Sequence, residues 1–248
     1  MNPIPWFQIC SRLGLPPATW MVQNPIKRYE FASVTNSVNL STADVILDVG
    51  CGKGHWTIAL SRHCRQAVGV DTSPDQIKTA HAFVRHSRFR SRVSFYCNSL
   101  EKLEFPNNHF DHVFSFCVLE HVKELESLLM EIACVLKPGG QFHFSVDSLE
   151  NLSDPEILTL HTSQHNVVQY FTANTLCDQL EDAGLRVKNI YPILTSSYAV
   201  QEFKKRIRHS YKYGLIANQR IFRHLAKQDQ VNGCNQGIIL IAHGISAH

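Results

Sequence analysis

The sequence lacks any apolar run long enough to cross a bilayer. No stretch of 18 apolar residues occurs among its 248 residues, whereas a transmembrane helix needs about 20. The N-terminus contains Trp6, Phe7 and Ile9, but no basic region precedes them and Pro3 and Pro5 interrupt the stretch, so a signal peptide is not expected. Internal repeats and low-complexity tracts are missing too. What remains is the profile of one α/β domain with enough apolar residues for a core.

Paired cysteines are also missing. The eight cysteines are scattered, and no two form a Cys-x-x-Cys pair. Disulfide frameworks and zinc sites need cysteines or histidines at characteristic spacings. We therefore expect reduced thiols, no metal site and a cytoplasmic location, with Cys51, Cys117 and Cys134 in core or loop positions.

Acidic residues are scarce in one segment, 201–227. It holds eight lysines and arginines against Glu202 alone, so its charge is +7 while the remainder of the chain carries −4. Apolar residues at four-residue spacing predict a basic amphipathic helix that is broken near Gly214: Phe203, Ile207, Tyr211 and Leu215. Three interpretations stay open: a cap helix with a solvated basic face, an interfacial helix on anionic lipid, or a phosphate-binding face for RNA. Because few aromatics interleave, we rank lipid or an acidic substrate above RNA and expect peripheral membrane contact.

Apolar runs and helical patterns alternate along the rest of the chain. Expected strands are 45–49, 67–70, 93–97, 112–116, 141–146, 186–193 and 237–243. Expected helices are 25–39, 55–64, 74–87, 122–136 and 175–183. Ser73 and Pro74 favour a helix start, and residues 138–140, Pro-Gly-Gly, are expected to stop the helix over 122–136. This alternation predicts a parallel-rich sheet with helices on both faces.

Some segments do not belong to this alternation. Residues 1–40 are expected to form an irregular and helical cover, followed by one domain over 41–248. Within that domain, segments 147–170 and 195–235 are predicted caps. Segment 147–170 leaves the carboxyl end of a strand, where open α/β sheets bind their ligands, and 195–235 is long for a connection between strands.

The most informative stretch is residues 45–54, Val-Ile-Leu-Asp-Val-Gly-Cys-Gly-Lys-Gly. A short apolar run followed by alternating glycines and a helix start places a nucleotide-like ligand at a helix N-terminus. The spacing is Gly-x-Gly-x-Gly rather than the Gly-x-Gly-x-x-Gly of dinucleotide sites. Asp48 precedes the first glycine, and its carboxylate would repel a pyrophosphate but suits a ligand that carries a cation.

A second acidic residue follows the glycine loop at an informative sequence spacing. Asp71 ends the next expected strand, 17 residues after Gly54. An acid about 20 residues after a glycine loop is placed to bind ribose hydroxyls. Thr72 and Gln76 stand beside it and are assigned to the same site.

Two further stretches complete a pattern. Residues 98–111 resemble Gly-Asp-Ala-x-x-Leu-Pro-Phe-x-x-x-x-Phe-Asp, and residues 118–122 and 136–140 read Val-Leu-Glu-His-Val and Leu-Lys-Pro-Gly-Gly. With the glycine loop and Asp71, these parts stand in order over about residues 43–147. In this order and spacing they resemble the class I S-adenosylmethionine-dependent methyltransferases, in the broad group that includes ubiquinone- and menaquinone-biosynthesis enzymes.

This resemblance implies a Rossmann-like, doubly wound seven-stranded sheet whose last strand is antiparallel, and S-adenosylmethionine as cofactor. Asn98 or Ser99 replaces the family aspartate that meets the adenine amine, and the Leu100 N–H is expected at an adenine ring nitrogen. The cofactor-binding assignment comprises Asp48, Gly50, Cys51, Gly52, Gly54, Asp71, Thr72, Gln76, Asn98, Ser99, Leu100, Phe116 and Cys117. Asp48 is expected near the methionine end of the cofactor.

The acceptor is the open part of the hypothesis. We expect methyl transfer to a small or lipid-like molecule, with His165, His121 or Glu120 as the general base if the acceptor is a hydroxyl. Residues 165–172 resemble a family segment that covers the active site in enzymes of small molecules. Two alternatives stay open: an RNA methyltransferase that grips phosphates with 201–227, and a regulatory protein that binds S-adenosylmethionine without catalysis.

Overall fold

The computed structural model describes residues 24–85, 87–209, 213–232 and 235–247. Seven strands form one sheet in the order β3-β2-β1-β4-β5-β7-β6. Neighbours from β3 to β5 pair in parallel, and β7 runs antiparallel to both β5 and β6. The strands are β1 Val45–Val49, β2 Gln66–Asp71, β3 Val93–Cys97, β4 Phe110–Phe116, β5 Leu136–Asp147, β6 Leu185–Ile193 and β7 Ile239–Ser246. The predicted fold class, with its antiparallel last strand, is confirmed.

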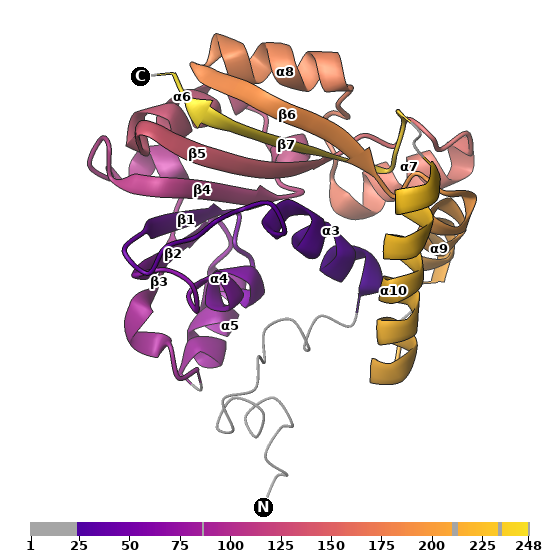
Figure 1. Ribbon diagram of the computed structural model, residues 1–248, viewed down its shortest axis with the longest axis horizontal. Helices are drawn as coiled ribbons and strands as arrows, with labels where there is room; N and C mark the ends of the chain where they lie inside the picture. Colours follow the sequence, from indigo (N-terminus) through magenta and orange to yellow (C-terminus); the bar gives the residue numbers. More distant parts are fainter. Residues whose placement is uncertain (1–23, 86, 210–212, 233–234, 248) are drawn as a thin grey trace, which may run out of the picture.

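Helices connect these strands and cover the sheet (Figure 1). They are α3 Pro25–Thr35, α4 His55–Leu60, α5 Pro74–Val84, α6 Leu125–Val135, α7 Pro155–His165, α8 Ala173–Asp182, α9 Ser197–His209 and α10 Leu215–Asn232. Short 3₁₀ turns are η1 Arg90–Arg92, η2 Leu100–Lys102 and η3 Leu119–His121. Two helix starts follow the usual capping rules. Ser73 and Asp154 accept capping hydrogen bonds at the N-termini of α5 and α7, and a proline follows each of them.

The central strands are buried on both faces. In β1, Ile46 packs in a cluster with α3 and α9, whereas the adjacent Leu47 packs in a cluster with α6 and α8. Every residue of β1 is buried. This is the reason why these strands read as continuous apolar runs rather than as alternating ones.

Several helices end earlier than expected. The helix over 122–136 was expected to stop at Pro138-Gly139-Gly140, but α6 ends at Val135 and β5 already begins at Leu136. Leu136 is fully buried and pairs with Phe110 of β4. Burial in the sheet therefore ends the helix earlier, and the pairing register shifts between Phe110 and His112 around the Pro-Gly-Gly segment.

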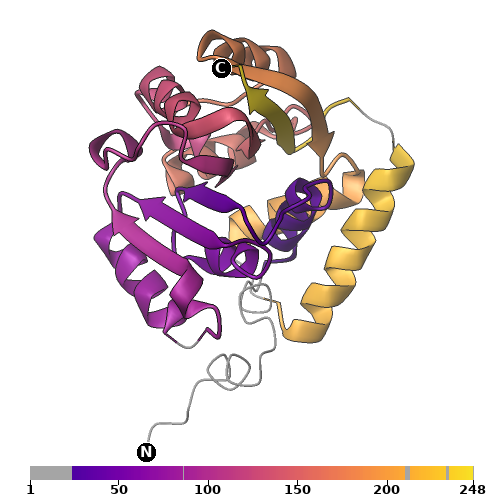
Figure 2. The ribbon, with the colours of Figure 1, turned by 60° about the vertical axis from the view of Figure 1, so that its left-hand side comes forward.

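The predicted cover segments gather at one side of the sheet, beyond the carboxyl ends of β4 and β5 (Figures 1 and 2). Residues 147–170 contain α7, residues 195–235 contain α9 and α10, and the part of 1–40 that is described contains α3; the expected irregular cover over 1–23 lies outside the described residues. Helix α7 packs on α9, and α10 packs on α3. Within the described residues, no helix combines the length and apolar character that a bilayer span requires.

Candidate functional site

The loop after β1 turns the chain with three left-handed glycines. Gly50, Gly52 and Gly54 have φ angles of 71°, 53° and 72°, which residues with a side chain rarely adopt. The N–H groups of Gly50 and Cys51 both donate to the Val70 carbonyl, at 2.8 and 2.9 Å. The loop is therefore tied to the end of β2, and α4 starts directly after it.

The space around these glycines fits a ligand at the middle one. A Cβ on Gly50 would lie 2.4 Å from Val118 Cγ2, and one on Gly54 would lie 2.3 Å from Phe95 Cζ. A Cβ on Gly52 would have no neighbour within 4 Å. The outer glycines are required by contacts within the protein, whereas the backbone at Gly52 faces open space and lets a ligand come close.

Asp71 lies beside this loop at the end of β2. Its carboxylate accepts the N–H groups of Gly52 and Ser73, both at 2.8 Å. A carboxylate has about four lone-pair sites, so acceptor positions remain for two ribose hydroxyls. Thr72 is exposed and Gln76 is half-buried at the start of α5. The structure thus brings these predicted residues to the glycine loop, and their binding roles stay predictions.

Asp48 is buried and pairs within the protein. It is 1% exposed, and Thr57 Oγ1 donates to its Oδ2 at 2.5 Å. Burial raises the pKa of Asp48 to about 7, against the opposing hydrogen bond from Thr57. Sequence reasoning did not find Thr57, and the expected position of Asp48 near the methionine end of the cofactor stays a prediction.

The segment after β3 carries the predicted adenine contacts. Asn98 is exposed, Ser99 is half-buried, and Leu100 is buried at the start of η2. The Ser99 N–H donates to Asn98 Oδ1 at 3.0 Å, and the Ser99 hydroxyl makes no cap for η2. These groups lie one strand away from Asp71, because Cys97 pairs with Asp71 across β3 and β2.

Helix α3 packs beside the loop and ends at Thr35, whereas a helix over 25–39 was expected; its role as a cover of the site stays a prediction. Phe31 stacks on Trp56 with ring centroids 4.2 Å apart and an angle of 11° between the planes. The Phe31 ring also lies 5.4 Å from that of Phe116. These three rings join α3 to the start of α4 and to the end of β4.

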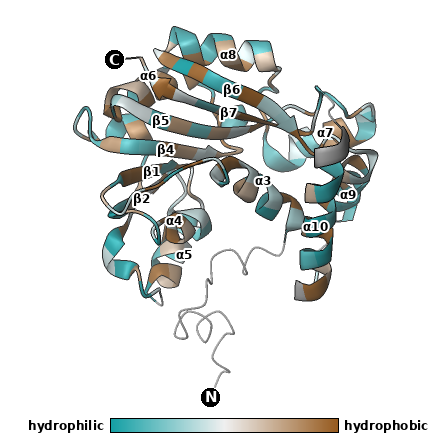
Figure 3. Ribbon diagram, in the orientation of Figure 1, coloured by the Kyte–Doolittle hydropathy of each residue, from teal (hydrophilic) through white to brown (hydrophobic). Residues whose placement is uncertain are grey.

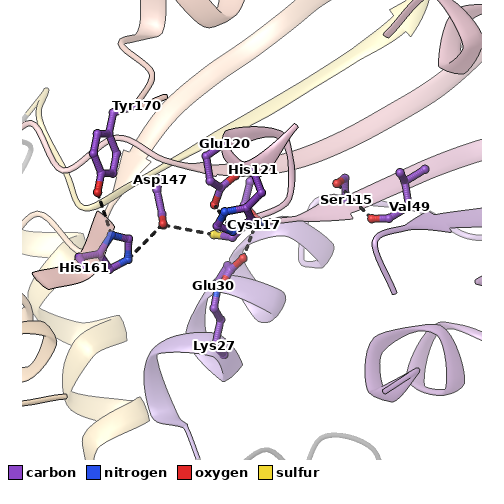
Figure 4. Close-up of polar contacts among 11 residues, drawn as sticks. Lys27, Glu30, Val49, Ser115, Cys117, Glu120, His121, Asp147, His161 and Tyr170 are labelled. Atoms are coloured by element: carbon purple, nitrogen blue, oxygen red, sulfur yellow. Dashed lines mark hydrogen bonds and ion pairs between the residues drawn. The ribbon is translucent and has the colours of Figure 1, made fainter. Parts of the chain in front are cut away.

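A group of buried carboxylates lies where α3 meets the ends of β4 and β5 (Figure 4). We call Glu30, Glu120 and Asp147 the carboxylate cluster. Glu30 is fully buried, accepts a hydrogen bond from Ser145 Oγ at 2.6 Å and pairs with Lys27 Nζ at 2.9 Å. Burial opposes the charge of Lys27, but Cys117, Glu30 and Asp147 raise its pKa well above the ordinary value.

Asp147 closes β5 and joins two side chains. Cys117 Sγ donates to its Oδ1 at 3.5 Å, and His161 Nε2 lies 3.3 Å from its Oδ2. Burial lowers the pKa of His161 to about 4, although Asp147 opposes the shift. A neutral His161 that donates to Asp147 accepts at Nδ1 from the Tyr170 hydroxyl, 3.0 Å away.

Cys117 connects β4 to the cluster. Its φ is 49°, which is uncommon for a residue with a side chain, and its N–H donates to the Ser145 carbonyl at 2.9 Å. Burial and the charge of Glu30 raise the pKa of the Cys117 thiol well above its ordinary value. The thiol therefore acts here as a weak hydrogen-bond donor rather than as a nucleophile.

Glu120 is the carboxylate without a partner. Its residue is 0% exposed, and neither carboxylate oxygen has a hydrogen-bond partner among the described residues. Its backbone carbonyl accepts the N–H groups of Val168 and Gln169 at 2.8 and 3.3 Å. Burial and the charge of Asp147 raise the pKa of Glu120 well above its ordinary value.

The two histidines predicted as bases lie at different depths. His121 is half-buried, and its Nε2 lies 3.9 Å from Glu120 Oε1. His165 is exposed, with its ring 4.7 Å from that of His161. Burial lowers the pKa of both histidines. The structure thus brings Glu120 and His121 together and places His165 at the rim, one helical turn after His161.

Sequence reasoning missed five residues of this site: Lys27, Glu30, Asp147, His161 and Tyr170. Asp147 had a usable signal, because it is a strand-end acid like Asp48 and Asp71. His161 had a weaker one, since it lies four residues before His165 on one helix face. Glu30 and Lys27 had none, because only the folded chain brings α3 to β5.

Comparisons with known proteins agree with this geometry. A family described as a methyltransferase domain matches residues 47–144. An uncharacterized methyltransferase of Schizosaccharomyces pombe is 28% identical over 172 residues, which are 63% of this chain and 65% of that protein. A ubiquinone biosynthesis O-methyltransferase of Coxiella burnetii is 28% identical over 153 residues, 58% of this chain and 64% of that protein. The chain thus spans less than two thirds of the length of these relatives.

A solved structure supports the fold. The geranyl diphosphate C-methyltransferase of Streptomyces coelicolor, solved with Mg²⁺, geranyl diphosphate and S-adenosyl-L-homocysteine, has a TM-score of 0.66 and 13% identity to this chain. The superposition covers 88% of this chain and 78% of that one. At this identity the likeness is one of fold.

Proposed function

We propose that this chain, which carries a class I S-adenosylmethionine-dependent methyltransferase domain, transfers a methyl group from that cofactor to a small-molecule or lipid-like acceptor. One observation carries the proposal: the glycine loop and the carboxylate cluster are adjacent. Gly50 has no room for a side chain because Val118 lies against it, and Val118 stands between Cys117 and Glu120. A donor at the loop and an acceptor at the cluster would therefore meet at the end of β4.

The residues around the loop suit the cofactor. Gly52 leaves space for it, Asp71 offers acceptor positions for ribose hydroxyls, and Ser99 stands one strand further along. When bound, S-adenosylmethionine supplies a methyl group on a positively charged sulfur. What this chain adds is orientation and a site from which water is excluded.

Helix α3 provides that exclusion in our proposal. Its Phe31 closes against Trp56 and Phe116, and its Glu30 bonds to Ser145 of β5. These contacts join the cover to both halves of the site. An acceptor held beneath α3 would therefore react in a largely dry environment.

The contacts of the basic segment 201–227 give little support to a role in binding nucleic acid. On α9, Lys204 and Arg208 pair with Asp154, at 3.0 and 3.5 Å, and Arg208 also reaches Glu156 at 3.3 Å. Phe203 and Ile207 are buried beneath them. Helix α9 is thus a cap helix that binds α7 through these ion pairs. Tyr211, which was expected among the apolar residues of this helix, lies outside the described residues.

We also propose that α10 contacts an anionic membrane surface. A groove of about 1220 Å³ between α3 and α10 is lined by Arg28, Arg220, Arg223 and Lys227 among other residues. Ile216, at the apolar start of α10, is 87% exposed (Figure 3). Exposed apolar and basic side chains on one helix are the combination that binds at a lipid interface.

Calorimetric titration of the full chain with S-adenosylmethionine tests the enzymatic proposal first. We expect binding, and then transfer of label from radioactive cofactor to a molecule in a metabolite extract. Absence of binding would overturn the proposal, and binding without any transfer would favour the non-catalytic alternative. Label transfer to RNA instead of small molecules would favour the RNA alternative.

Vesicle sedimentation tests the membrane proposal. Each basic residue near an anionic surface contributes about 1 kcal/mol, so reversing Arg220 and Arg223 to Glu should weaken binding to phosphatidylglycerol vesicles about 30-fold. The matched control reverses Arg85 and Arg90, which are exposed beside α5, far from α10. Equal losses in both double variants, or no binding by the wild type, would refute a specific role for α10.

A further inference from the structure

The carboxylate cluster holds three carboxyl groups against one ammonium group. Glu30, Glu120 and Asp147 face the single ammonium of Lys27, and Lys27 is already paired with Glu30. His161 and His121 add no positive charge near neutral pH, because burial lowers the pKa of both. Buried charges are normally paired, since removing them from water is costly. Burial and the charge of Asp147 raise the pKa of Glu120, so a further positive charge is needed for all three carboxyl groups to be ionised together.

Glu120 marks the place for such a charge. Both of its oxygens are inaccessible and without a hydrogen-bond partner among the described residues, in a residue that is 0% exposed. A buried unpartnered polar group costs about 1–3 kcal/mol, and more when it is charged. A ligand that donates hydrogen bonds to Glu120 would remove this cost.

The spacing of the cluster suits an ammonium group. Ligand atoms of Cys117, Glu120 and Asp147 all lie within 4.8 Å of one another. Two acceptors that each lie about 2.8 Å from one tetrahedral nitrogen are about 4.6 Å apart. A protonated amine has three N–H donors, which can reach Glu120 and Asp147 together.

We propose that the methyl acceptor is an amine, bound as its ammonium ion between Glu120 and Asp147, and that Glu120 takes the proton that must leave the nitrogen before methyl transfer. This inference rests on the proposed function. Proton transfer leaves a neutral amine and a protonated Glu120. The amine lone pair then forms the nitrogen–carbon bond while the carbon–sulfur bond breaks with its electrons on sulfur, which gives a protonated methylamine.

The cluster favours this reaction over two others. Positive charge moves from sulfur to nitrogen during transfer, and nearby carboxylates stabilise charge that develops at that point. A neutral hydroxyl acceptor would bring no positive charge to the three carboxyl groups, and a carboxylate or phosphate acceptor would be repelled by those that are ionised. The raised pKa of Glu120 also suits a group that receives a proton near neutral pH.

Calorimetry with paired probes tests the inference without relying on turnover. The full chain, saturated with S-adenosylhomocysteine, is titrated with benzylamine and with benzyl alcohol, which share a shape but differ in charge. We expect benzylamine to bind at least about tenfold more tightly. Repeating the titration in buffers of different ionisation enthalpy should show a proton released on binding, because the buried Glu120 is ionised by its new partner.

Two variants locate the effect. Glu120→Gln keeps the shape of the side chain and should weaken benzylamine binding at least about tenfold while abolishing proton release. Glu124→Gln makes the same change at an exposed glutamate with no capping bond and should bind like the wild type. The comparison of the two probes on the wild type needs no variant, so it decides the question even if Glu120→Gln does not fold.

Several outcomes would overturn the inference. Equal affinity for the two probes, an unchanged Glu120→Gln, or amine binding without proton release would each do so. Displacement of benzylamine by Zn²⁺ or Mg²⁺ in a Glu120-dependent manner would show a metal centre instead. Cofactor binding without any amine binding would remove this inference alone, whereas loss of cofactor binding would remove the proposed function.

Discussion

Replacing His143 with leucine should destabilise the protein at pH 7 and leave it about as stable as the wild type at pH 5. His143 is the centre of a hydrogen-bonded row that crosses the sheet. Its Nε2 lies 3.0 Å from His112 Nδ1, and its Nδ1 lies 2.9 Å from His243 Nδ1. The row continues from His112 to Asp44 at 3.4 Å and from His243 to Tyr191 at 3.4 Å.

The loss of unfolding free energy at neutral pH comes from the two histidines that lose their hydrogen-bond partner. Leucine would leave one nitrogen of the buried His112 and one of the half-buried His243 unpaired, at about 1–3 kcal/mol each. Burial of the leucine side chain contributes about 1.5–3 kcal/mol in the other direction. The net loss of unfolding free energy at pH 7 is therefore about 2 kcal/mol.

The pH dependence of the wild type cancels this loss on acidification. Burial lowers the pKa of His143 to about 2, whereas a histidine in the unfolded chain titrates near 6.5. Between pH 7 and 5, His143 therefore becomes protonated in the unfolded state but stays neutral in the folded state. Stability is full above the unfolded pKa, and linkage gives a loss of about 2 kcal/mol from His143 by pH 5.

Urea unfolding at pH 7, 6 and 5, followed by circular dichroism, measures this directly. The control is His63→Leu at an exposed histidine, whose stability should parallel that of the wild type throughout. His112 and His243 remain in the His143→Leu variant, so their titration largely cancels in the comparison. If the wild type and His143→Leu run parallel from pH 7 to 5, the row does not exclude protons from His143 and the reasoning fails.

Two further predictions concern the loop. Asp71→Ala should weaken S-adenosylmethionine binding at least about tenfold, since it removes charge-assisted hydrogen bonds, while Asp75→Ala, an exposed position in α5, should bind normally; an unchanged calorimetric titration would remove Asp71 from the donor site. Gly54→Ala should lower the unfolding free energy by about 2–5 kcal/mol, because its Cβ would meet Phe95 at 2.3 Å and its φ is 72°. The control is Gly139→Ala, because Gly139 has a similar φ of 71° but a Cβ there would have no neighbour within 4 Å. Thermal unfolding of this control should show only the backbone cost of about 1–2 kcal/mol. Equal losses would mean that packing does not require glycine at 54.

The donor half of the site was predictable because its signals are local. The order of strand, glycine loop and helix over residues 45–60 follows from apolar runs and turn residues, and the structure forms these elements. Asp71 was expected beside the loop from spacing alone, and its bond to the Gly52 N–H confirms that the two are neighbours. Short-range rules of strand, turn and cap are sufficient for such a unit.

The predicted ends of helices and strands that proved wrong are those that burial in the folded protein determines. Leu136 was assigned to a helix by its periodicity with Leu129 and Ile132, yet it is extended and pairs with Phe110 at the sheet. Periodicity cannot distinguish the last turn of a helix from the first buried residue of the next strand. The same limitation hid the full length of β5.

The acceptor half was not predictable, because its residues come from segments far apart in the chain. Glu30 meets Ser145 across 115 positions, and Asp147 meets His161 across a turn and a helix that the sequence marked only as a cover. No spacing rule connects such residues. Only the folded chain shows that Glu120, one of three predicted bases, lies among other carboxylates, while His165 stands at the rim.

The two halves of the site are held by different elements of the fold. The donor residues are fixed by the loop and by β2, whereas the carboxylate cluster is held by α3, β5 and α7. The halves meet where Val118 lies against Gly50 and where Phe31 stacks on Trp56. Glu120→Gln should still leave S-adenosylmethionine affinity within about twofold of the wild type, because Glu120 and the loop share no hydrogen-bond partner among the described residues and changes at sites without shared partners usually add to within about 0.3–0.5 kcal/mol. A large change in that affinity would show that the cluster positions the donor rather than the acceptor.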